Sequence, residues 1–128
     1  MTITMILEIE NGISLDDIIM LLNKLENSYQ CKEGAIFGNF NKSNSRFVFR
    51  CNDKPEPLVA EGVNFQWLVG ITGSFHSRAD SLGKSREDVE NFLKLLDATS
   101  LYNFVLSFQY EDVYVIRNGA HMQILKEW

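Results

Sequence analysis

The segment from Tyr102 to Leu125 constrains the fold more than any other, because its pattern is that of three consecutive β-strands. In its first part, YNFVLSFQY, large apolar residues occupy every second position, as in a strand with one buried face. The Asn118-Gly119 pair then separates two further alternating runs, and Asn-Gly is the strongest short-range signal for a two-residue hairpin loop. Such a loop would place Val115 opposite Met122. The segment therefore predicts a three-stranded antiparallel meander with one core face.

The remaining segments predict the rest of a sheet and two helices. Period-two alternation predicts strands at 2–9, 35–40, 46–51 and 63–72, and a short edge strand fits near 58–60. Apolar residues at helical spacing predict amphipathic helices at 15–25 and 85–98, each opened by Ser-x-x-Asp, a variant of the capping box. Residues 73–84 keep no period and read as a surface loop, and loops of that length are often functional. The order predicts an α+β fold in one domain, 1–128: a bent, mostly antiparallel sheet of six to seven strands packed against two amphipathic helices.

Composition narrows the range of functions. The chain has 45% hydrophobic residues, and no apolar run approaches the ~20 residues of a membrane span, so we expect no membrane association. The first residues contain Glu8 and Glu10 and no basic segment, so we expect no secretory signal and a cytoplasmic location, with Cys31 and Cys51 as free thiols. We expect Cys51 to face inward on its strand. The net charge of −5 disfavours nucleic acid and favours a basic partner.

No local motif predicts catalysis or a cofactor. His76 and His121 have no Cys, His or carboxylate at a recognised metal-ligand spacing, so we expect no metal site. Ser74, His76 and Asp80 contain the residue types of a hydrolase triad, but no nucleophile elbow accompanies them. We therefore expect a protein that is not an enzyme and that carries no cofactor.

Aromatic and acidic residues meet in YEDVY, at 110–114, and this segment carries the functional hypothesis. Four features together carry a resemblance: this segment, the start MTITMILEIENG, the acidic turns and the lack of catalytic motifs. In these features the chain resembles immunity proteins of bacterial contact-dependent growth inhibition and related polymorphic toxin systems. The resemblance implies a small cytosolic protein, a monomer or a one-to-one heterodimer. Its partner would be a cognate toxin domain whose active site it occludes, and a basic nuclease fits the charge best.

The expected partner-binding residues come from two segments. They are Phe75, His76 and Asp80 in the expected loop, and Tyr110, Glu111, Asp112 and Tyr114 around the expected hairpin tip. An alternative is a small-molecule-binding or enzymatic α+β domain, with a pocket in the bent sheet lined by Trp67, Tyr114 and His121. A third is an oligomeric scaffold that associates through the mixed face of the meander.

Overall fold

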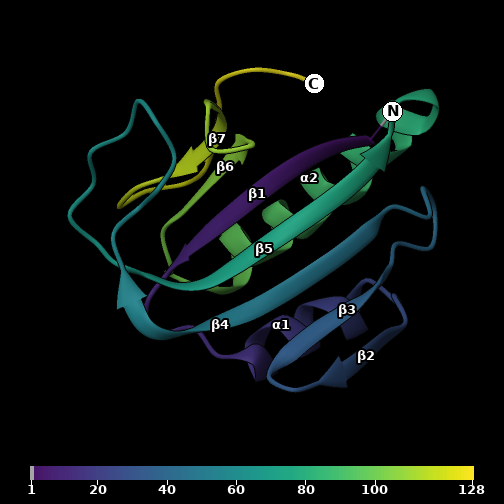
Figure 1. Ribbon diagram of the computed structural model, residues 1–128, viewed down its shortest axis with the longest axis horizontal. Coiled ribbons are helices and arrows are strands. Elements are labelled where there is room, and N and C mark those ends of the chain that lie inside the picture. Colours follow the sequence, from purple (N-terminus) through teal and green to yellow (C-terminus); the bar gives the residue numbers. More distant parts are fainter. Residues whose placement is uncertain (1) are drawn as a thin grey trace.

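A computed structural model of the chain, which describes residues 2–128, contains one eight-stranded sheet (Figure 1). Every neighbouring pair of strands is antiparallel, and the strand order is β2-β3-β4-β5-β1-β6-β7-β8. The strands are β1 (Thr2–Glu10), β2 (Tyr29–Lys32), β3 (Ala35–Asn39), β4 (Arg46–Glu56), β5 (Val69–Arg78), β6 (Phe104–Phe108), β7 (Asp112–Arg117) and β8 (Gln123–Ile124). The central pair, β1 and β5, lies side by side along its whole length.

Two helices cover one face of this sheet and leave the other without helices. Figure 1 shows α2 (Leu82–Thr99) behind β1 and β5, and α1 (Leu15–Lys24) packs on β3, β4 and α2. The core between these layers includes interlocked aromatic rings whose centroids lie 5.0 to 6.2 Å apart: Phe40, Phe47, Phe49, Phe75 and Phe92. The predicted α+β fold is confirmed, with eight strands rather than six or seven. The additional strand is β2, not the expected one near 58–60.

The two helices begin differently. At α1 the Ser14 hydroxyl accepts from the Asp17 N–H (3.2 Å) and the Asp17 carboxylate accepts from the Ser14 N–H (2.9 Å), so the predicted capping box is confirmed. Helix α2 begins at Leu82, after the short 3-10 helix η1 (Ala79–Ser81), and not at Ser85. Ser85 is buried within the first turn and hydrogen-bonds Ser45, so the sequence Ser-x-x-Asp has a packing role there.

The predicted strand 63–72 is right only for its last four residues, and the predicted loop 73–84 is wrong. Residues 61–68 form a loop, whereas β5 extends through the first half of the expected loop and pairs with β1 on one side and β4 on the other, and η1 and the start of α2 occupy the second half. Gly73 explains the broken pattern, because a Cβ on it would lie 2.7 Å from Cε1 of Phe49. Small residues therefore point inward in this strand. Cys31 and Cys51 are both free and exposed, so the expectation of an inward Cys51 is wrong.

The meander exists, but its second turn is longer than predicted. Val115 pairs with Ile124 rather than with Met122, and β8 contains only two residues. The segment between β7 and β8 does not close as a two-residue turn, because the Met122 N–H donates to Asp97 of α2 (3.2 Å). Asp97 also accepts from Arg117, the last residue of β7, at 2.8 Å. These contacts fasten β7 and the following segment to α2.

Candidate functional site

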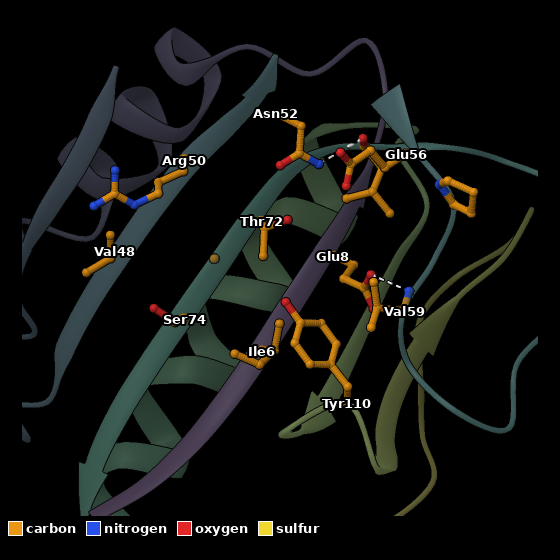
Figure 2. A pocket seen from close by; sticks show the side chains of 13 residues that line it. Ile6, Glu8, Val48, Arg50, Asn52, Glu56, Val59, Thr72, Ser74 and Tyr110 are labelled. Atoms are coloured by element: carbon orange, nitrogen blue, oxygen red, sulfur yellow. Dashed lines mark hydrogen bonds between the residues drawn. The ribbon is translucent and has the colours of Figure 1, made fainter. Parts of the chain in front are cut away.

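The candidate site is a groove of about 380 Å³ on the face of the sheet that carries no helix (Figure 2). Its floor is made by β4, β5 and β1, whose register places Arg50, Thr72 and Glu8 in one row across the three strands. The next row contains Val48, Ser74 and Ile6. The floor is therefore polar and charged at one end and partly apolar in the middle.

Glu8 is the most unusual residue of the groove, because its carboxylate is buried. Only 2% of the residue is exposed, and both carboxylate oxygens accept backbone hydrogen bonds, from the N–H of Val59 (2.8 Å) and of Ala60 (3.0 Å). Burial raises the pKa of Glu8 above its ordinary value of 4.5, and the two hydrogen bonds oppose that rise. Among residues 2–128 no Lys, Arg or His lies within ion-pair distance of this carboxylate.

One wall of the groove is the start of the connection 57–68, from which Pro57 and Val59 line the hollow. Besides the two bonds to Glu8, the Glu61 N–H donates to the Tyr110 carbonyl (2.7 Å) and the Leu68 carbonyl accepts from Asn11 (2.7 Å). The Trp67 indole N–H donates to the Asn118 side chain (3.1 Å). These contacts fix the connection near both of its ends, at 59–61 and at 67–68.

Tyr110 forms the neighbouring wall from the turn between β6 and β7. This turn closes with a bond from the Glu111 N–H to the Phe108 carbonyl (2.8 Å), and both of its central residues, Gln109 (φ 49°) and Tyr110 (φ 67°), have left-handed backbone conformations. Non-glycine residues rarely adopt that conformation. Figure 2 shows the Tyr110 ring beside Ile6 with its hydroxyl directed back over the sheet. Burial, and then the Glu8 charge, raise the pKa of the Tyr110 phenol.

Charge is divided across the groove. Glu56 lines the groove at the end of β4, and three further acids follow in the segments that continue this side, Glu61 in the connection and Glu111 and Asp112 next to Tyr110 in the turn. Asp112 is paired with Lys126 at 3.2 Å, whereas within residues 2–128 Glu61 and Glu111 have no ion pair. Arg50 lines the opposite side, on β4 (Figure 2). The groove therefore has a negative side and a positive side.

The expected partner-binding residues divide into three groups. Tyr110, Glu111 and Asp112 lie together at the tip of the β6–β7 turn, as predicted. His76 is on the same face as Tyr110, where its Nδ1 lies 3.1 Å from the Thr4 hydroxyl, and the Thr4 carbonyl accepts from the tip residue Gln109 (3.3 Å).

The other three lie elsewhere. Asp80 is exposed in η1, beyond the end of β5. Phe75 is fully buried in the core, so its predicted place on a surface loop is wrong. Tyr114 packs against the core, beneath the Lys126 ammonium at 5.8 Å from the ring centroid, and does not line the groove.

The alternative pocket residues do not converge on one cavity. Trp67 stacks on Phe65, with ring centroids 6.1 Å apart, and His121 is 94% exposed beside Asp97. Apart from Tyr110, the groove is lined by residues that the sequence analysis did not select, Glu8 foremost. A signal for Glu8 is present, because it is an acid in the middle of the apolar first strand.

No group of His, Cys, Asp and Glu side chains within residues 2–128 is arranged to hold a metal ion. Nor is any helix in that range both long and apolar enough to cross a membrane. No protein-family model matches the chain, and comparisons with curated proteins and with solved structures find no similar protein. The groove is therefore interpreted from its own chemistry.

Proposed function

We propose that this protein is an immunity protein that acts in the bacterial cytoplasm. It binds a basic toxin domain, such as a nuclease, one to one and occludes the active site of that domain. The single observation that carries the proposal is the aromatic and acidic turn at the edge of the groove, where Tyr110 lines the hollow together with the buried Glu8 carboxylate and Glu111 follows it in the turn. The net charge of −5 would attract such a partner over long range.

The arrangement has the parts that a protein interface needs. A partly buried aromatic residue beside a hollow is a typical anchor, and charges at the rim mainly raise the association rate and the specificity. The turn is held by the Glu111–Phe108 hydrogen bond and by the connection at Glu61, so little ordering would be required on binding. The face is also free of covering helices.

The proposal is tested by calorimetric titration with the toxin-like domain encoded next to this gene, at two salt concentrations. We expect one-to-one binding that weakens with salt and abolishes the activity of the toxin. Glu111→Lys should weaken binding at low salt by at least about tenfold, because it reverses an unpaired rim charge. Glu33→Lys is the matched control, since it makes the same exchange at an exposed left-handed residue in the β2–β3 turn, at the far edge of the sheet. Equal effects of the two variants would reject the acidic side as the interface.

A second candidate function is the binding of a small polar molecule in the groove. Its volume of about 380 Å³ lies within the range of ligand sites, and carboxylate, hydroxyl and guanidinium groups line it. A thermal-shift screen of small metabolites separates the two functions. A ligand that stabilises the wild-type protein but not Thr72→Val would support this candidate. If the protein saturated with that ligand still bound the toxin, the ligand site and the toxin-binding surface would be different surfaces.

A further inference from the structure

We infer that Glu8 and Tyr110 form a receptor for a single cationic side chain, Lys or Arg, that the partner inserts into the groove. This inference rests on the proposed function and specifies what the partner contributes. Its starting point is the buried Glu8 carboxylate, which lines the groove without a cation from residues 2–128.

The hydrogen bonds to Glu8 leave acceptor capacity unused. Each oxygen of a carboxylate can accept two hydrogen bonds, and each oxygen of Glu8 receives one protein bond, from Val59 or from Ala60. The remaining lone pairs are available to the fork of a guanidinium or to an ammonium group. The backbone donors also fix the carboxylate, so it need not be ordered when the cation arrives.

Tyr110 supplies the second contact. Its ring and the Glu8 side chain both line the groove, and Figure 2 shows them on the same side of β1. A cation attracted by the face of an aromatic ring and by a carboxylate gains from both at once. Left-handed backbone at both central residues is what a tight hairpin turn between β6 and β7 requires, and this turn fixes the position from which Tyr110 lines the groove.

Arg50 determines where the cation can enter. It lines the β4 side of the same groove, in the row of Thr72 and Glu8 and separated from Glu8 by the intervening strand β5. A cation arriving over β4 would meet this like charge, whereas the side formed by Tyr110, Glu56 and the connection is neutral or acidic. Removal of the Arg50 charge should therefore strengthen cation binding, while removal of the Glu8 charge should abolish it.

The test uses small probes, so that it does not depend on the toxin. N-acetyl-argininamide and N-acetyl-lysinamide are titrated into the labelled protein and followed by ¹H–¹⁵N NMR. The backbone amides of Val59 and Ala60 are the reporters, because they donate to Glu8. N-acetyl-citrullinamide is the neutral control of nearly the same shape as the arginine probe. We expect saturable shifts of both reporters with the cationic probes, no saturable shift with citrulline, loss of the shifts in Glu8→Gln, and about threefold or greater tightening in Arg50→Gln.

Several outcomes would overturn the receptor: equal response to arginine and citrulline, shifts confined to the acidic rim, or Arg50→Gln binding no more tightly than wild type. The Arg50→Gln measurement keeps the test decisive if Glu8→Gln does not fold, because it leaves Glu8 in place. Failure of the proposed function is distinguishable. A chain that binds the arginine probe but no toxin retains the receptor and loses the immunity function, whereas toxin binding without any response to arginine does the reverse.

Discussion

The Glu8→Ala substitution should loosen the wall of the groove, because it removes the acceptor that holds the connection 57–68 to the central strand. The Ala60 N–H is buried and the Val59 N–H is partly buried, and both donate to the same carboxylate. Hydrogen bonds to charged groups each contribute about 1.5 to 3 kcal/mol, which sets an upper limit of roughly 3 to 6 kcal/mol for the two together.

Two effects reduce the loss below that limit. Water can enter the open groove and hydrate the released N–H groups, and burial of the Glu8 charge already costs free energy, as its raised pKa indicates. We therefore expect a loss of about 2 kcal/mol at pH 7, or about 7 °C in Tm, from a typical unfolding entropy of roughly 2.1 cal/mol/K per residue. Glu56→Ala, at an exposed acid of the same groove, should change stability by less than about 0.5 kcal/mol.

The loss should also depend on pH in a definite direction. Because the folded-state pKa of Glu8 lies above its ordinary value of 4.5, the folded protein binds this proton more tightly than the unfolded chain does. The corresponding stabilisation is complete below pH 4.5 and is lost as the pH rises through the folded-state pKa. The stability advantage of wild type over Glu8→Ala should therefore be larger at pH 4 than at pH 7.

Urea unfolding at both pH values, together with hydrogen exchange of the Val59 and Ala60 amides, measures these effects. We expect earlier unfolding and faster exchange of both amides in the variant. Unchanged exchange protection in Glu8→Ala would refute the assignment of Glu8 as the anchor of the connection. An advantage of wild type that grows from pH 4 to pH 7 would refute the account of its ionisation.

Three further substitutions test the scaffold. Asp97→Ala leaves the nearly buried Arg117 without its counter-ion and should lower the free energy of unfolding in urea by about 3 to 5 kcal/mol. Asp97→Leu combined with Arg117→Met should recover most of that loss, and equal losses in the single and double variants would contradict a stabilising role of this ion pair. Gly73→Ala forces a methyl group against Phe49 and should cost about 1 to 3 kcal/mol, and a neutral result would mean that the ring moves freely. Ser14→Ala removes the α1 cap and should lower the free energy of unfolding by about 1 kcal/mol, whereas an unchanged value would show that the cap contributes nothing.

Periodicity was a reliable guide where one face of an element is uniformly apolar. The first strand, α1 and β6 lie close to their predicted bounds for this reason. It failed at β5, because the inward positions of that strand include Gly73 and Ser77, which interrupt the alternation of large apolar residues. The space beside Gly73 is filled by Phe49 from another strand, and no local pattern contains that information.

The candidate site was predictable only in part, for a related reason. The aromatic and acidic tip at Tyr110 and Glu111 is a local feature and was identified from the sequence. Glu8, which lines the same groove as Tyr110, is more than 100 positions away in the sequence, and its carboxylate is held by two N–H groups of the connection between β4 and β5. A single charge in an apolar strand indicates a special position, but the contacts that make it special arise only in the tertiary structure.

Two costs to stability meet at this one place in the molecule. Glu8 is a carboxylate buried without a cation, and the turn beside it holds Gln109 and Tyr110 in left-handed conformations that each disfavour a side chain by about 1 to 2 kcal/mol. The turn does not require these residues, because Asn-Gly could occupy its two central positions, whereas the cost of burying Glu8 is offset in part by the two N–H groups that its carboxylate holds. Left-handed residues also occur at other turns, at Glu26, Glu33 and Asn44, so the left-handed turn alone does not single out the groove. The distinguishing feature of the groove is the Glu8 carboxylate, which is buried without a cation from residues 2–128 and still lines an open hollow, as expected of a surface kept for binding.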